Sequence, residues 1–328
     1  MVSATTSDQT ARTGTFNYMA ETSTPSLFRN GKVLTRRDRD GSDSGWEGVD
    51  REPRAMPVQD ARILQDAPTL ACNGFELRPN ALGNLEVDFF DQDAVLRQYY
   101  PHCAEIVRDA CGASLVAAFD HNVRSAVGKE GKQRIRGGQQ VQGPAHMVHG
   151  DYTLTSAPQR LRDLARPPRL NDTLRSVLPD GEALLDPGNV NEALLDGRFA
   201  IINLWRSIAK EPVVTHPLAL CDAATVQPDD LVVFEIHYHD RIGENYFAKH
   251  AVDHGWYFYP DLNRDEALLI KQWDSDGPLA TSDGAKADAA DTEAPCTFSF
   301  HSAFEDPATP ANAAERWSIE VRCVALYD

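Results

Sequence analysis

The sequence lacks long apolar runs and a basic character. None of its stretches approaches the roughly 18 consecutive apolar residues of a membrane span, so we expect no transmembrane helix. Asp and Glu number 49 against 32 Lys and Arg, which gives a formal net charge of −17 at pH 7. A surface this acidic repels phosphate backbones, so the composition argues against nucleic acid as a partner.

The sequence is also poor in cysteine and in common catalytic motifs. Its six cysteines form no C-x-x-C pair and are too sparse for a disulfide scaffold, so we interpret them as reduced thiols of a cytoplasmic protein. The polar segment 1–12 lacks the apolar part of a signal peptide, which agrees with that location. Dinucleotide-binding, P-loop and serine-hydrolase motifs are absent, so these three function classes have no support.

The chain does contain enough apolar residues for a core, arranged in short runs. Hydrophobic residues make up 42% of it, and runs of β-branched and aromatic residues predict strands. The predicted strands are 32–35, 75–78, 85–89, 114–124, 199–206, 231–239, 256–259, 297–302 and 316–327. The predicted helices are 58–64, 93–110 with a break at Pro101, 157–164 and one ending at 192–196, while 266–274 fits a helix or a strand. This order favours an α+β fold, an antiparallel β core with N-terminal helical decoration.

The length of 328 residues fits one decorated domain preceded by an extension. Segment 1–14 is rich in Ser and Thr and predicts a frayed tail, and the charged and Gly-Ser-rich run 36–45 predicts a polar, mobile stretch over 22–56. We therefore expect a mostly irregular extension over 1–56 and a single domain over 57–328. Inside that domain, the low-complexity segment at about 275–295 predicts an exposed insertion.

The motif His149-Gly150-Asp151 is the first candidate for chemistry. On an extended strand, residues two apart point to the same face, so an imidazole nitrogen and a carboxylate oxygen could bind one cation. A distant histidine would complete the two-histidine, one-carboxylate triad of non-haem Fe(II) oxygenases, which leaves positions open for a cosubstrate and O₂. Alone the motif is weak, because a histidine and a capping aspartate at a turn give the same pattern.

His301 is the candidate third ligand, and Arg316 with Ser318 is a candidate anion site. The alternation of 298–302 places His301 on the polar face of its run. Fifteen residues further on, Arg316 and Ser318 share a strand face, where a guanidinium and a hydroxyl could bind a carboxylate. A dicarboxylate cosubstrate such as 2-oxoglutarate requires such a site. The alternatives are a satisfied core histidine and an ion pair of Glu320 with Arg316 or Arg322.

Other residues compete for these roles. Arg322 is a rival anchor for the cosubstrate. A cupin-type metal protein without oxygenase activity is the alternative function, because His237 and His239 alternate on one strand; Glu235 lies on the same strand face and Glu244 follows nearby, but no second cupin motif follows. The pair His250 and His254 has the i, i+4 spacing of a zinc site on a helix, but Ala251 stands where a catalytic glutamate would be expected.

A further set of residues could line a substrate or cosubstrate pocket. Arg124, Asn203, Trp205 and Tyr259 lie on predicted strands and are the candidates for this role. The alternative places Trp205 in the core and Arg206 in a surface ion pair, and aromatic residues on strands are in general more often core residues.

In these residues the chain resembles a family of fungal and bacterial hydroxylases and desaturases. The family includes proteins of the cephamycin methoxylase, gibberellin desaturase and aspergillic-acid hydroxylase types. The matching stretches, spread in order over about 57–328, are 99–124, 148–151, 203–222, 256–274, 298–307 and 316–322. The most specific are Phe-His-Ser-Ala-Phe at 300–304 and Arg-x-Ser-Ile-Glu-Val-Arg at 316–322.

The resemblance implies an Fe(II) and 2-oxoglutarate-dependent oxygenase of secondary metabolism on a double-stranded β-helix, a cupin-like jelly roll. By matching position, it assigns His149, Asp151 and His301 to iron and Arg316 with Ser318 to the distal carboxylate of 2-oxoglutarate. The implied reaction uses O₂ and begins with hydrogen abstraction from an unactivated C–H bond. It ends in hydroxylation, desaturation or oxidative cyclisation of a small molecule, such as an amino acid or a natural-product intermediate. We expect a monomer or homodimer without membrane or nucleic-acid partners.

Overall fold

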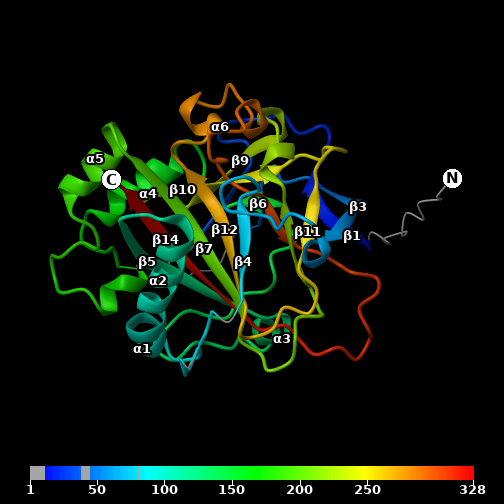
Figure 1. The fold of residues 1–328 in the computed structure, drawn as a ribbon, viewed down its shortest axis with the longest axis horizontal. Coiled ribbons are helices and arrows are strands. Elements are labelled where there is room, and N and C mark those ends of the chain that lie inside the picture. Colours follow the sequence, from blue (N-terminus) through cyan, green and yellow to red (C-terminus); the bar gives the residue numbers. More distant parts are fainter. Residues whose placement is uncertain (1–11, 38–44, 80, 84, 171) are drawn as a thin grey trace.

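Two β-sheets form the framework of the protein in the computed structural model, which describes residues 12–37, 45–79, 81–83, 85–170 and 172–328 (Figure 1). The larger sheet has nine strands. Their spatial order is β1 (Arg12–Met19), β3 (Arg51–Asp60), β11 (Trp256–Phe258), β8 (Leu218–Cys221), β13 (His301–Ala303), β6 (His149–Gly150), β10 (Ile242–Ala248), β9 (Leu231–His237) and β2 (Leu34–Arg36). Neighbouring strands are antiparallel except for β3 with β11 and β2 with β9.

The smaller sheet has five antiparallel strands. Their order is β4 (Phe75–Arg78), β12 (Ala267–Asp274), β7 (Arg198–Ser207), β14 (Ser318–Tyr327) and β5 (Leu115–Arg124). All of β12 and nearly all of β7 are buried on both faces, because helices cover one face and the larger sheet lies against the other. This two-sided burial explains why 266–274 shows no clear alternation of polar and apolar residues.

Helices cover the outer face of the smaller sheet. A helical segment starts with α1 (Gln92–Ala94), widens into the π-helical turn η2 (Val95–Tyr99) and continues as α2 (Tyr100–Cys111), which lies against β5 and β14 (Figure 1). Pro101 stands in the first turn of α2, so the predicted break occurs where proline is tolerated. The other helices are α3 (Ala126–Glu130), α4 (Ser156–Leu164), α5 (Pro187–Leu195) and α6 (Pro278–Thr281).

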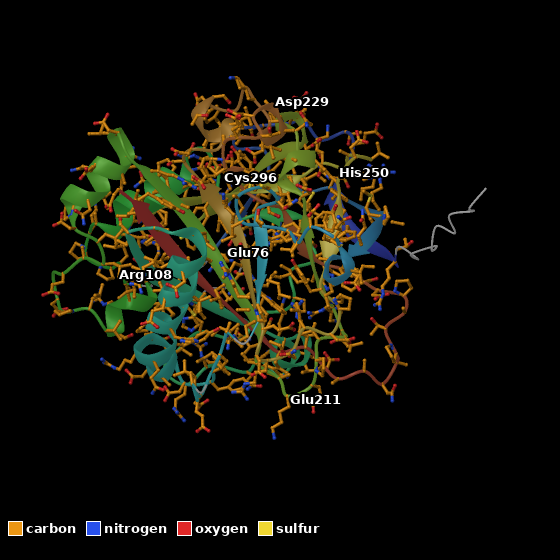
Figure 2. All side chains as sticks on the ribbon, viewed as in Figure 1. Glu76, Arg108, Glu211, Asp229, His250 and Cys296 are labelled. Atoms are coloured by element: carbon orange, nitrogen blue, oxygen red, sulfur yellow. The ribbon has the colours of Figure 1, made fainter. Side chains whose placement is uncertain are left out.

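Charged side chains such as Glu211 and Asp229 project from the outline of the molecule (Figure 2).

The N-terminal segment belongs to the larger sheet, which corrects the predicted extension. Strand β1 pairs with β3 over its whole length, and Phe16 and Tyr18 are fully buried. The boundary predicted at 56 therefore falls inside β3. The principal helices lie between residues 92 and 195, after these strands, and not at the N-terminus. Residues 1–11 of the predicted tail and 38–44 of the predicted polar stretch lie outside the described residues, whereas residues 12–14 of that tail belong to β1.

Two local predictions are wrong. The helix predicted at 58–64 is the end of β3 followed by a 3₁₀ turn, η1 (Ala61–Ile63), because pairing with β1 and β11 outweighs a short apolar periodicity. The described residues of the predicted strand 85–89 form no strand, although Val87 and Phe89 are buried in the core. Strands β1, β3, β8 and β10 were not predicted.

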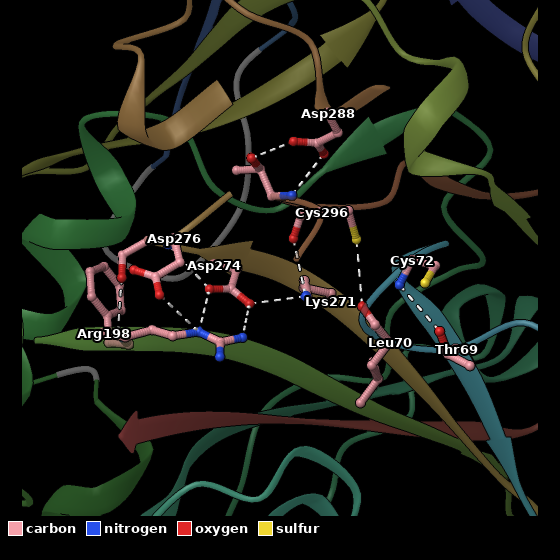
Figure 3. A network of polar contacts seen from close by, with 12 residues as sticks. Thr69, Leu70, Cys72, Arg198, Lys271, Asp274, Asp276, Asp288 and Cys296 are labelled. Atoms are coloured by element: carbon pink, nitrogen blue, oxygen red, sulfur yellow. Dashed lines mark hydrogen bonds and ion pairs between the residues drawn. The ribbon is translucent and has the colours of Figure 1, made fainter. Parts of the chain in front are cut away.

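The acidic segment 275–295 is not simply exposed. It contains α6 and a 3₁₀ turn, η6 (Asp288–Ala290), and Leu279 is buried. Asp288 accepts hydrogen bonds from the backbone N and the Oγ1 of Thr297 at 2.7 and 2.6 Å (Figure 3). Directly before the segment, Asp274 accepts two hydrogen bonds from Arg198 and one from Lys271 (Figure 3). These contacts fix both ends of the segment just before β13.

Candidate metal centre

The two candidate histidines lie on adjacent strands in the middle of the larger sheet. His149 on β6 pairs directly with His301 on β13, and paired residues of antiparallel strands point to the same face. Their ring centroids are 4.2 Å apart. Asp151 follows β6 immediately, and one ligand atom from each of the three residues lies within 4.8 Å of the others. Among the described residues, this is the one such cluster of three His, Cys, Asp or Glu side chains.

Neighbouring groups orient the ligand atoms. The Nδ1 of His149 donates to the carbonyl of Met147 at 2.7 Å, which assigns the lone pair to Nε2, 3.7 Å from Oδ1 of Asp151. The other carboxylate oxygen, Oδ2, accepts from Nδ2 of Asn203 at 2.9 Å and from Nε of Arg322 at 3.2 Å. Asp151 therefore presents a single oxygen toward the histidines.

The charge states of the three side chains suit a divalent cation. Burial lowers the pKa of His149 to about 4 and also lowers the pKa of His301, so both imidazoles are neutral at pH 7. Burial alone would raise the pKa of Asp151, but the positive charge of Arg322 and the hydrogen bond from Asn203 lower it below its usual range. Two neutral imidazoles and one carboxylate are the donor set that non-haem Fe(II) favours, so the residues fit this metal.

Arg316 and both histidines line one small cavity. Arg316 is 3% exposed, its Nη1 donates to the carbonyl of His216, and its guanidinium lies over the Trp205 ring with 5.7 Å to the centroid. The Nε of Arg316 and the Oγ of Ser318 are buried and have no hydrogen-bond partner. These donors, without a protein acceptor, fit the carboxylate of a cosubstrate.

The predicted pocket residues divide into three groups. Arg124 and Trp205 line the cavity. Asn203 instead holds Asp151, as described above. Tyr259 lies outside the cavity lining, in a separate apolar cluster, where Arg62 covers its ring. The surface ion pair considered for Arg206 is wrong, because this residue is fully buried and forms no ion pair with any described residue.

The competing assignments for Arg322 and Glu320 are resolved by their contacts. Arg322 donates to Asp151, to Asp120 at 3.0 Å and to Glu320 at 3.2 Å. It is thus occupied by protein carboxylates and is a poor anchor for a cosubstrate. Glu320 contacts Arg322, so the pair with Arg316 considered from the sequence does not form.

Sequence reasoning missed Gln272 on β12. Its Oε1 accepts a hydrogen bond from the backbone N of Asp151 at 2.9 Å, and its Nε2 lies 3.5 Å from Nδ1 of His301. Gln272 therefore contacts two of the three candidate ligands. Only the strand assignment of 266–274 could have pointed to it, because no motif surrounds it.

The residues of the cupin-type alternative are engaged elsewhere. Glu235 accepts from His237 at 2.9 Å and from two backbone N–H groups at 2.6 and 3.0 Å. Glu244 forms an ion pair with Arg29. His254, from the candidate zinc pair, is also engaged: it is buried between Tyr18 and Asp230, with a ring nitrogen 3.2 Å from a polar atom of each. In the described part of the chain, Glu235, His237, Glu244 and His254 belong to no cluster of three possible metal ligands.

Comparison with known proteins places the chain in a family. A family described as oxidoreductase/YMDC permease-like domain matches residues 16–179 and 182–326, nearly the whole chain. The chain belongs to this family. It is 43% identical over 194 residues to a Methylophilus leisingeri protein, named as an uncharacterized protein in the dcmA 3′ region. The match covers 58% of this chain and 88% of that protein.

Several curated relatives are named as hydroxylases, desaturases or dioxygenases. The hydroxylase/desaturase poxK of Penicillium oxalicum is 26% identical over 310 residues, with 86% of this chain and 82% of that one covered. Other relatives are named Fe(II)/2-oxoglutarate-dependent or alpha-ketoglutarate-dependent dioxygenases. The predicted resemblance to hydroxylases and desaturases and the predicted class of 2-oxoglutarate-dependent oxidoreductases are confirmed, and the oxygenase interpretation is favoured over the cupin-type alternative.

The fold agrees with these names. The iron and alpha-ketoglutarate-dependent endoperoxidase NvfI superposes with a TM-score of 0.69 at 21% identity, and the match covers 96% of this chain and 97% of that one. The predicted jelly-roll core is therefore confirmed as a fold. A separate observation concerns membranes: among the described helices, none combines the length and the apolar character needed to cross a bilayer.

Proposed function

We propose that His149, Asp151 and His301 hold Fe(II), and that Arg316 with Ser318 binds the distal carboxylate of 2-oxoglutarate. The observation that carries this proposal is the convergence of three ligand atoms within 4.8 Å beside the cavity that Arg316 lines. When bound, the iron and 2-oxoglutarate supply the O₂ chemistry that removes hydrogen from an unactivated C–H bond, with succinate and CO₂ as co-products.

The protein's own residues then have separate tasks. Asn203 and Arg322 hold one oxygen of Asp151, so the other oxygen keeps its direction toward the metal position. Arg316 fixes the orientation of the cosubstrate, because a guanidinium binds a carboxylate through two parallel hydrogen bonds. Leu218, Ala303 and Trp205 provide apolar lining to the cavity, which limits the access of water to the reacting centre.

The substrate is proposed to be a small molecule, such as an amino acid or a natural-product intermediate. The names of relatives, which include hydroxylase/desaturase and endoperoxidase, support a reaction that begins with hydrogen abstraction. Hydroxylation, desaturation and oxidative cyclisation all share that first step, and this chain is proposed to catalyse one of them. A monomeric or dimeric state stays a prediction.

A spectroscopic experiment tests the proposed metal and cosubstrate site. Anaerobic protein with Fe(II) and 2-oxoglutarate should show a weak visible metal-to-ligand charge-transfer band. We expect His149→Ala to abolish the band and His237→Ala to keep it, because His237 contacts Glu235 and not the candidate ligands. The reverse pattern would overturn the proposal in favour of the cupin-type alternative.

A further inference from the structure

Arg206 is a buried cation that the proposed reaction does not use. It lies on β7 next to Trp205, and because strand residues alternate, its side chain points to the other face of the smaller sheet. The residue is fully buried, and Nε, Nη1 and Nη2 all lack a hydrogen-bond partner. Its guanidinium lies over the ring of Tyr99, with 5.4 Å to the centroid.

The surroundings of Arg206 offer hydrogen-bond donors but no negative charge. Tyr99 is fully buried as well, and its hydroxyl has no partner. Burial raises the pKa of Tyr99 well above its usual value and that of Cys103 to about 12, so both groups near Arg206 are neutral at pH 7. No carboxylate of the described residues forms an ion pair or hydrogen bond with Arg206. Burial of an unpaired guanidinium is energetically costly, and a bound anion would reduce this cost.

Other arginines in the protein show what is missing at this position. Arg62 lies over the Tyr259 ring at 5.8 Å and makes two hydrogen bonds to Glu266. Arg198 lies over the Tyr327 ring at 4.1 Å and makes two hydrogen bonds to Asp274. Each thus has an aromatic ring and a carboxylate, whereas Arg206 has the ring alone.

The helix above Arg206 is irregular at this point. Tyr99 is the last residue of the π-helical turn η2, directly before α2. Turns of this kind inside helices are rare and occur frequently at functional sites. Here the turn brings a phenol donor and its ring to the only guanidinium of the described part of β7 that has no partner.

We propose that Arg206 and Tyr99 bind a small monovalent anion, a halide or a carboxylate of formate size, between η2 and the smaller sheet. Arg206 and Tyr99 are both fully buried, so we expect only small anions to reach them. The bound anion links the helix to β7, the strand whose other face carries Asn203 and Trp205. This site is separate from the proposed metal centre and does not depend on it.

Thermal unfolding at constant pH and ionic strength tests the proposal. Sodium gluconate, whose anion we expect to be too large for this buried site, is replaced stepwise by chloride, bromide or formate. We expect the melting temperature to rise with the small anion, and the folding equilibrium constant to increase roughly tenfold at ten times the dissociation constant. A response to formate but not to halides would identify the occupant as a carboxylate.

Three variants assign the response to this site. Arg206→Met removes the charge and should abolish the anion dependence. Tyr99→Phe keeps the ring and removes one donor, so it should weaken the dependence. Arg62→Met is the matched control, because it removes an arginine that a carboxylate already neutralises, and it should keep the full dependence.

A crystal grown with bromide gives the direct readout and remains informative if Arg206→Met does not fold. An anomalous bromide peak within hydrogen-bond distance of the Arg206 guanidinium is expected. Water alone at this position, together with an anion dependence that is equal in the wild type and in Tyr99→Phe, would overturn the proposal. So would an Arg206→Met variant that keeps the wild-type response to chloride, bromide and formate.

Discussion

At the scale of single residues, Arg316 combines burial with unused hydrogen-bond donors. Its Nε and the nearby Oγ of Ser318 have no acceptor among the described residues. We expect Arg316→Ala to weaken 2-oxoglutarate binding by about 3–5 kcal/mol, roughly a hundred- to a few-thousand-fold. Iron binding should change little, because Arg316 is not a candidate ligand. Calorimetric titration of 2-oxoglutarate into the anaerobic Fe(II) protein measures the difference.

Two further variants control this prediction. Arg316→Lys should restore binding only in part, because an ammonium group cannot form two parallel hydrogen bonds. Arg62→Ala should leave 2-oxoglutarate binding unchanged, since Arg62 is engaged with Glu266. Arg322→Ala is unsuitable as a control, because Arg322 contacts Asp151. Unchanged binding in Arg316→Ala would show that the anchor is another residue.

Asn203 is a second residue with a specific expectation. It shares the Oδ2 of Asp151 with Arg322, so Asn203→Ala removes one of the two contacts that orient the carboxylate. Loss of such a supporting contact typically costs about 10- to 100-fold in metal affinity. Competition with a chelator measures the Fe(II) affinity. Asn73→Ala removes a similar amide–carboxylate contact, to Asp222 at 3.0 Å, away from the candidate ligands and should not change it.

The sequence reveals candidate ligands more readily than their supports. His149 and Asp151 form a motif because two ligands on one strand must be two residues apart. Asn203 and Gln272 contact Asp151 from other strands, and their sequence positions obey no fixed spacing to it. Only the pairing of strands brings them there, so a motif search could not assign their roles.

At the scale of elements, β1 makes the N-terminal segment part of the core. Phe16 stacks on Trp256 and Phe304 at 4.4 and 5.5 Å between ring centroids. We expect Phe16→Ala to reduce the free energy of unfolding by about 3–5 kcal/mol. Phe28→Ala, at a side chain that is 47% exposed, should change it by about 0.5 kcal/mol or less. Urea denaturation measures both, and equal effects would contradict the packing of β1.

The sequence predicted those strands whose burial produces a long apolar run. It missed strands that form mainly because they pair with other strands. The continuous apolar runs of β7, β9 and β14 are clear in the sequence, and their predicted ranges agree closely with the structure. Strand β8 has only four residues, and β10 mixes polar and apolar residues without a clear run. Both are also paired with strands distant in sequence, β8 with β13 and β10 with β6.

At the scale of the whole molecule, the net charge of −17 should affect stability. Repulsion among the excess carboxylates destabilises the compact state, and salt screens it as the Debye length falls from about 30 Å at 0.01 M to about 8 Å at 0.15 M. We expect added sodium gluconate to raise the melting temperature at pH 7. Near the isoelectric point of about 5.0, where the net charge vanishes, the rise should be much smaller. An equal rise at both pH values would contradict this explanation.

The parallel pairing of β3 with β11 has a consequence for the newly made chain. Val58 of β3 lies opposite Trp256, about 200 residues later. At the usual rate of synthesis, about 10–40 s pass between the synthesis of β3 and that of β11. During this time, an open strand edge invites pairing with another nascent chain. Strand β3 contains Pro53 and Pro57, which cannot donate backbone hydrogen bonds, and several charged residues. The strand thus carries its own protection against aggregation until residues 256–258 arrive.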